Sequence, residues 1–150
     1  MTTREPLYAL SYVSQSRIPG LQIHHELQAI EQTSLHRNAQ AGITGKLIYR
    51  LGHFVQRLEG AEEALDETME RISDDRRHRN INIISREPID TRVYHDWQQL
   101  IVLLEGPELD DLDTMLGFMV ARPKFSVRPW EADIMLSALT RVTTSSNDLL

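Results

Sequence analysis

The stretch KLIYRLGHFVQRLEG (residues 46–60) decides the fold, because it reads as two strands joined by a tight turn. The runs 46–50 and 53–59 are both strand-like, with aromatic and aliphatic side chains interrupted by polar ones. Leu51 and Gly52 lie between them, and a two-residue connection containing glycine is typical of a β-hairpin. The centre of the chain therefore predicts two antiparallel strands.

Further strands and helices flank this hairpin on both sides. Period-two spacing predicts a strand over 7–14, and apolar residues spaced by three and four predict a helix over 21–35. A second helix is expected to begin at Gly60, where glycine can serve as its cap. The other expected elements are strands at 80–87 and 93–104, helices at 109–119 and 130–142, and a frayed end at 143–150.

The order β-α-β-β-α-β-β is that of a ferredoxin-like α+β fold with one extra strand. In such a fold two helices cover one face of a mixed sheet. We therefore expect the two C-terminal helices to cover the other face. The chain divides accordingly into a sheet domain at 1–104 and a helical extension at 105–150 that packs on the sheet.

Composition excludes several classes of function. The chain has 150 residues, a formal net charge of −6 and no cysteine, so it lacks disulfides, thiolate metal ligands and a thiol nucleophile. No run is long enough for a membrane helix, and a mildly acidic chain is poorly suited to binding nucleic acid directly. His24 and His25 diverge on a helix, so no metal site is expected. We expect a cytoplasmic protein that does not enter a membrane.

Two polar side chains are expected within the core. Phe54, Gln56 and Leu58 share one face of their strand, so Gln56 is buried if its neighbours are. Tyr12 lies in the same layer by the same parity argument. A buried carboxamide needs partners for two donors and one acceptor. A hydrogen bond between Tyr12 and Gln56 would either satisfy two core groups or form part of a functional site.

Several segments occur in an order that points to one family. They are Leu7–Ser14, Asn38 with Gly42-Ile43-Thr44-Gly45, Gly52–Gly60, Asp75-Arg76-Arg77-His78, and Asp96-Trp97. Together they resemble the BLUF family of blue-light-sensing flavin domains. The resemblance covers residues 7 to about 104, and residues 105–150 resemble only the short helical extensions of single-domain members.

The resemblance implies that FAD binds non-covalently between the first two helices. Asn38, expected just past the first helix, would accept a hydrogen bond from the flavin N3–H and donate one to the adjacent C4 carbonyl. The other implied contacts are apolar packing by Ile30 and Ile72, and polar contacts to the C2 carbonyl and ribityl side from Asp75, Arg77 and His78.

The resemblance also implies a photochemical role for a few side chains. Light would draw an electron and then a proton from Tyr12 through Gln56 and leave Gln56 rotated or tautomerised. Trp97 would stand beside this pair or swing outward. The family usually has methionine two residues later, where this chain has Gln99. Gln99 either competes for, or completes, the hydrogen bonds of Gln56, or it faces solvent at a strand edge.

We expect a light sensor without catalytic turnover that signals through contact with a separate downstream protein or through changed association as a homo-oligomer. Alternatives stay open. Asp75, Arg77 and His78 could instead bind a phosphorylated ligand in a small ferredoxin-like enzyme or binding protein. The basic cluster Arg76-Arg77-His78-Arg79 could also be a solvated turn after a helix. A further alternative is an interaction module that does not respond to light.

Overall fold

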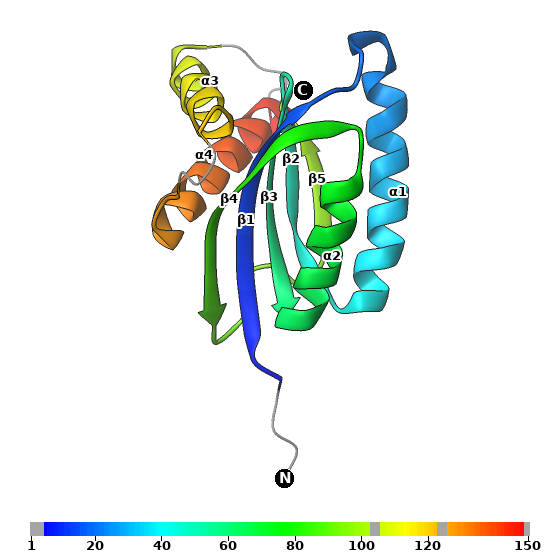
Figure 1. The fold of residues 1–150 in the computed structure, drawn as a ribbon. Coiled ribbons are helices and arrows are strands. Elements are labelled where there is room, and N and C mark those ends of the chain that lie inside the picture. The colour runs from blue at the N-terminus through cyan, green and yellow to red at the C-terminus, as the bar shows by residue number, and fades with distance from the viewer. Residues whose placement is uncertain (1–4, 103–105, 123–125, 149–150) are drawn as a thin grey trace.

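The structure is a computed structural model that describes residues 5–102, 106–122 and 126–148. A five-stranded mixed sheet runs through its centre, with helices on both faces (Figure 1). The elements are β1 (Leu7–Ser16), a 3-10 turn (Gly20–Gln22), α1 (Ile23–Ala41), β2 (Thr44–Arg50), β3 (His53–Ala61), α2 (Glu62–Asp74), β4 (His78–Ile89), β5 (Trp97–Ile101), α3 (Pro107–Val120) and α4 (Pro129–Asp148).

The strands lie in the order β4-β1-β3-β2-β5. β1 is antiparallel to both β3 and β4, β2 and β3 form the expected hairpin, and β5 is parallel to β2. The hairpin turn has positive φ angles at Leu51 (37°) and Gly52 (89°), as expected for a turn that matches the twist of its strands. Gln56 is in register with Tyr12 on one side and with Leu47 on the other.

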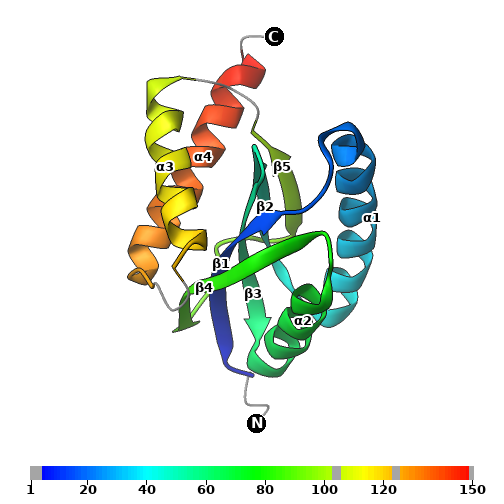
Figure 2. The same ribbon diagram turned by 45° about the horizontal axis from the view of Figure 1, so that its top comes forward.

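A separate apolar core lies on each face of the sheet. Leu10, Phe54 and Leu58 pack with Leu27 of α1 and Leu65 of α2 on one face. On the opposite face, side chains of β1, β2 and β3 pack with α3 and α4, among them Val13, Ile48, Val55, Leu116 and Leu136. Figure 2 shows α1 and α2 on one side of the sheet and α3 and α4 on the other. The expected α+β fold is confirmed.

The end of α1 and the start of α2 differ from the sequence prediction. α1 continues past residue 35 and ends where Gly42 turns into the left-handed region (φ 69°), so Asn38 lies inside the helix and not beyond it. Gly60 is still part of β3 and α2 begins at Glu62, because the strand keeps its pairing with β1 up to Ala61.

The last strand and the last helix also differ from the prediction. β5 begins at Trp97 instead of Val93, because the backbone amides of Val93 and Tyr94 donate to the buried Glu59 carboxylate and not to a neighbouring strand. α4 continues to Asp148, so residues 143–148 are helical where a frayed end was expected. Leu103 and Leu104, predicted as strand, and residues 149–150 lie outside the described residues.

Two buried arginines of the central hairpin hold the C-terminal helices. Arg50 is 1% exposed and forms an ion pair with Asp113 of α3 at 3.0 Å. Arg57 is 3% exposed and pairs with Asp133 of α4 at 2.7 Å and with Glu59 at 3.0 Å. These charges are paired, as buried charges must be. Arg57 directly follows Gln56, so adjacent residues of β3 face the two opposite layers.

Candidate functional site

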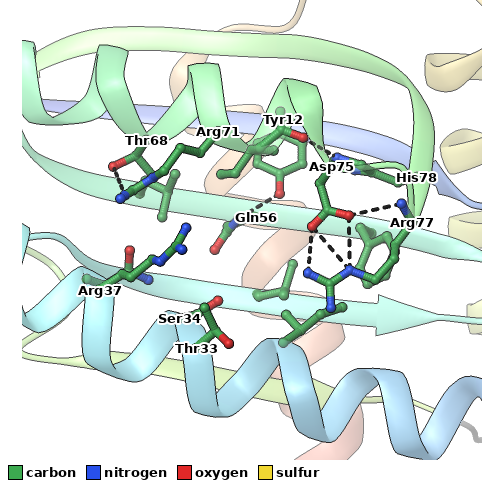
Figure 3. A pocket seen from close by; sticks show the side chains of 16 residues that line it. Tyr12, Thr33, Ser34, Arg37, Gln56, Thr68, Arg71, Asp75, Arg77 and His78 are labelled. Carbon is green, nitrogen blue, oxygen red and sulfur yellow. Dashed lines mark hydrogen bonds and ion pairs between the residues drawn. The ribbon is translucent and has the colours of Figure 1, made fainter.

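A cavity lies between α1 and α2 above the central strands (Figure 3). Its volume is about 130 Å³, and the space continues to solvent between the two helices. The lining includes all of the residues for which the sequence predicted cofactor contact, together with Tyr12: Ile30, Asn38, Gln56, Ile72, Asp75, Arg77 and His78. Trp97 and Gln99 are not part of the lining.

Tyr12, Gln56 and Trp97 form a buried line of hydrogen bonds beside this cavity. The Gln56 Nε2 donates to the Tyr12 hydroxyl at 2.6 Å, and the Trp97 Nε1 donates to the Gln56 Oε1 at 2.9 Å. The three residues are 3%, 4% and 5% exposed. They come from β1, β3 and β5, which the sheet brings together from distant parts of the sequence.

The Trp97 indole determines which way the Gln56 amide points. An indole N–H only donates, so the atom that faces it must be an acceptor. The amide oxygen therefore faces Trp97, and the amide nitrogen faces Tyr12. The Tyr12 oxygen accepts this bond, which leaves its own O–H free for another acceptor.

Burial raises the pKa of the Tyr12 phenol well above its ordinary value, because a phenolate would lose its hydration there. The hydrogen bond from Gln56 acts in the opposite direction, and the charge of Asp75 adds to the rise. The phenol is therefore protonated across the physiological pH range. It can release its proton only if an electron leaves with it or a strong acceptor forms nearby.

His78 lies beside Tyr12 but has both ring nitrogens engaged. Its Nε2 lies 2.6 Å from the Ile72 carbonyl, so that nitrogen carries a proton and donates. The Nδ1 lies 2.8 Å from the Ser14 hydroxyl, from which it accepts in the neutral ring. The ring also contacts Tyr12 and Phe54 edge to face. His78 therefore offers a ligand its ring surface and not a free nitrogen.

Asp75 and Arg77 close one end of the cavity. The Asp75 carboxylate accepts from the Arg77 backbone N–H at 2.9 Å and from its guanidinium at 2.7 Å. Partial burial raises the pKa of Asp75, but these bonds and the positive charge of Arg77 outweigh it and hold that pKa below its ordinary value. The guanidinium also reaches Glu26 of α1 at 3.6 Å. Arg77 thus spans the two helices.

Asn38 lines the cavity without a protein partner. It is 5% exposed and lines the cavity, yet its carboxamide forms no hydrogen bond with any described residue. A carboxamide that lines a cavity can bond a ligand that offers a donor and an acceptor side by side. Ile30 of α1 and Ile72 of α2 supply apolar walls for such a ligand.

Gln99 takes neither of the roles that its sequence position suggested. Its Nε2 donates to the Leu27 carbonyl of α1 at 3.0 Å, and its Oε1 is buried without a partner among the described residues. Leu47 lies in register between Gln56 and Gln99, so the two amides are two strands apart. Trp97, and not Gln99, completes the hydrogen bonds of Gln56. Gln99 holds β5 against α1.

The sequence analysis missed the polar residues of the two helices that line the cavity. They are Thr33, Ser34 and Arg37 of α1 and Thr68 and Arg71 of α2. Helical spacing was the available signal for four of them, because Thr33, Ser34 and Arg37 lie three, four and seven residues from Ile30, and Thr68 lies four residues from Ile72. Within the described residues, no cluster of histidine and acidic side chains is suited to a metal ion. None of the described helices has the length and hydropathy to cross a bilayer.

Known proteins share this fold and these segments. The family model for BLUF, described as sensors of blue-light using FAD, matches residues 7–100. Photoactivated adenylate cyclase subunit beta of Euglena gracilis is 40% identical over 88 residues, which is 59% of this chain and 10% of that protein. The subunit alpha of the same organism is 38% identical over 59% of this chain and 8% of its own length. The chain thus spans about a tenth of these curated relatives.

Two solved structures extend the comparison. BlrB, a BLUF protein in its dark state, has a TM-score of 0.65 and 35% identity, covering 79% of this chain and 92% of its own. BlsA in its photo-activated state has a TM-score of 0.69 and 25% identity, covering 89% and 94%. The shared domain is a sensor and not an enzyme, as the sequence predicted. The family match spans more than half of the residues, so this chain belongs to the BLUF family of blue-light sensors that use FAD.

Proposed function

We propose that this chain is a cytoplasmic blue-light receptor in which the Tyr12–Gln56–Trp97 line of hydrogen bonds converts light absorption into a change of protein contacts. The observation that carries the proposal is the line itself. A buried phenol and a buried carboxamide, 2.6 Å apart, stand at the wall of a cavity between two helices. The alternative is that the bond between Tyr12 and Gln56 only satisfies two buried polar groups. That alternative does not explain why Asn38, at the same cavity, has no hydrogen-bond partner among the described residues.

The side chains around the cavity fit a flavin. When bound, FAD supplies a ring that absorbs blue light and accepts electrons. Asn38 would meet the N3–H and C4 carbonyl of that ring, and Ile30 and Ile72 would pack on its faces. Arg77, paired with Asp75, would present its guanidinium to the C2 carbonyl. His78 would add packing only, because both of its nitrogens are already bonded.

The protein side of the mechanism follows from donors and acceptors. Tyr12 would lose an electron and a proton. The Gln56 NH₂ group donates to the phenol oxygen, so Gln56 can receive that proton only after its amide oxygen turns toward the phenol. Rotation of Gln56 would turn its NH₂ group toward the Trp97 N–H, and two donors cannot bond. Tautomerisation would convert the oxygen that faces Trp97 into a hydroxyl. Either change weakens the bond that holds Trp97 at 2.9 Å.

We propose that this change reaches α3 and α4 through the central hairpin. Arg57 follows Gln56 on β3 and pairs with Asp133 of α4, and Arg50 on β2 pairs with Asp113 of α3. A shift of the central strands therefore acts directly on two ion pairs whose arginines are buried. The output would be altered contact of these helices with a separate signalling protein or with a second copy of the chain, without direct contact to nucleic acid or membrane.

A difference spectrum between dark and illuminated protein tests the proposal. The flavin-loaded protein should show a reversible red shift of its flavin bands. Tyr12→Phe and Gln56→Leu should each retain the flavin and abolish the shift. Tyr8→Phe is the matched control, because Tyr8 lies on the same strand but not at the cavity, and it should keep the shift. Bound flavin without any shift in the unaltered protein would instead identify a light-insensitive module.

A further inference from the structure

Glu59 is a buried carboxylate near the end of β3, away from the cavity between α1 and α2. Its side chain is 0% exposed and shares the α3 and α4 face of β3 with Val55 and Arg57. A buried charge is stable only where its partners neutralise it and bond its oxygen atoms. The partners of Glu59 therefore indicate its role.

On one side, the Glu59 carboxylate holds the segment that leads into Trp97. The backbone N–H groups of Val93 and Tyr94 donate to it at 3.0 and 2.8 Å. β5 begins at Trp97, only three residues after Tyr94. Because the backbone between these points is short, a displacement of Trp97 pulls on the two bonds to Glu59.

On its other side, the carboxylate holds Arg57. The Arg57 Nε and Nη2 donate to the Glu59 Oε2 at 3.2 and 3.0 Å. The same guanidinium donates through Nη1 to the Asp133 Oδ1 of α4 at 2.7 Å. Hydrogen bonds between charged groups are roughly twice as strong as neutral ones. Glu59, Arg57 and Asp133 thus form one chain of strong bonds from the segment before Trp97 to α4.

A carboxylate is the side chain that suits this junction. The backbone N–H groups on one side of Glu59 and the guanidinium on the other side are all donors. A glutamine at this position could accept on one side only, because its NH₂ group would face donors on the other, and two donors cannot bond. Glu59→Gln therefore separates the segment before Trp97 from Arg57 with little change in side-chain size.

We propose that Glu59 is a positioning residue that links Trp97 to α4, so that contacts made at α4 set the lifetime of the light state. The inference rests on the proposed function, because it assumes a light state in which the bond between Trp97 and Gln56 is weakened. Return to the dark state requires the segment before Trp97 to regain its place, and Glu59 holds that place. Coupling between two sites acts in both directions, so a change at Asp133 alters how firmly Trp97 is held.

The exposure of the two ends of this chain sets the size of the expected effects. The Asp133 side chain is 46% exposed, so Asp133→Asn should slow dark recovery roughly twofold to fivefold. Glu59 is fully buried, so Glu59→Gln should slow it roughly tenfold. Both changes slow recovery, because a loosened segment returns Trp97 to Gln56 less readily.

The test measures the rate of dark recovery by absorption in the flavin-loaded full chain. The variants are Glu59→Gln, Asp133→Asn and the double variant. Asp111→Asn is the matched control, because it makes the same change at an exposed residue of α3 that belongs to no ion pair among the described residues.

Both single variants should keep the red shift of the flavin bands and recover more slowly than the unaltered protein. The double variant should recover at the rate of Glu59→Gln, because the loss of Asp133 cannot reach Trp97 once Glu59 no longer joins the two sides. A role in stability alone would not give this result, since two independent losses multiply their effects on the rate. Asp111→Asn should recover at the unaltered rate.

Unchanged recovery in Asp133→Asn would overturn the link, and this result decides the matter even if Glu59→Gln does not fold. A double variant slowed by the product of the two single effects would also overturn it, and so would equal slowing in Asp111→Asn. A missing red shift in the unaltered protein would overturn the proposed function and the link together, whereas the other results leave the proposed function intact.

Discussion

Replacing Trp97 by phenylalanine should break the hydrogen bond that orients the Gln56 amide, and a double-mutant cycle with Gln56→Leu measures the strength of that bond. The bond is 2.9 Å long, and both side chains are about 5% exposed or less. In each single variant the remaining partner keeps a buried polar atom without its bond. In the double variant neither of these two polar groups is left without its partner, because both have been removed.

The expected coupling follows from these contacts. Leaving a buried donor or acceptor unpaired costs about 1–3 kcal/mol of unfolding free energy. The loss of unfolding free energy in the double variant should therefore be smaller than the sum of the losses in the two single variants by about 1–2 kcal/mol. The cavity left by the smaller phenylalanine ring is present in both Trp97 variants, so most of its cost cancels in the cycle.

Equilibrium unfolding in urea of the four proteins with equal flavin load gives this coupling energy, provided that all four unfold with the same m-value. The absorption spectrum should change in parallel, because an unoriented Gln56 amide alters the position of the flavin bands. Additivity within about 0.3 kcal/mol would refute the reasoning, since it would mean that Trp97 and Gln56 are not in contact in solution.

Three more predictions follow from other contacts. Gln99→Met should keep the flavin and change the rate of dark recovery, measured by absorption, because it removes the bond from Gln99 to the Leu27 carbonyl that holds β5 against α1. Asp133→Asn should cost about 1 kcal/mol and speed amide hydrogen exchange in α4, because Arg57 loses a partly exposed partner. The pKa of Asp75 is lowered by Arg77, so its stabilising charge is fully present above the ordinary value of 3.8 and is lost as pH falls below it. Urea unfolding between pH 3 and pH 6 should show this loss, and Asp75→Asn should flatten it.

Each of these predictions has its own contrary result. Unchanged dark recovery in Gln99→Met would mean that the contact of Gln99 with α1 has no part in the response. The exchange of α1 and α2 amides serves as the internal control for Asp133→Asn, and equal acceleration there would point to global unfolding. If Asp75→Asn loses unfolding free energy with falling pH as steeply as the unaltered protein does, then other carboxylates cause that loss.

Much of the site was visible in the sequence because strands impose a strict period of two. The parity of Phe54, Gln56 and Leu58 placed Gln56 in the α1 and α2 layer, and the same argument placed Tyr12 there. The element order determined the fold class, since a mixed sheet with two helices on one face leaves the other face for the last two helices. These inferences depend on local periodicity, which a single chain displays.

The ends of the helices and strands were harder to predict from the sequence, because tertiary contacts compete with the local sequence pattern. Val93 was expected to be in a strand, but its backbone N–H donates to Glu59, a residue 34 positions earlier. Gly60 was expected to cap a helix, but it remains in β3. Asn38 was expected beyond a helix that in fact continues to Ala41. In each case a long-range contact or a continued backbone ladder outweighed the local signal.

The sequence by itself determined the layers of this protein, the pairing of the phenol with the carboxamide, and the family. Only the tertiary structure decided that Trp97 and not Gln99 meets Gln56, and that both nitrogens of His78 are already bonded. The reason is physical: periodicity assigns each side chain to a face, whereas its hydrogen-bond and charge partners depend on which distant segments the fold places beside it.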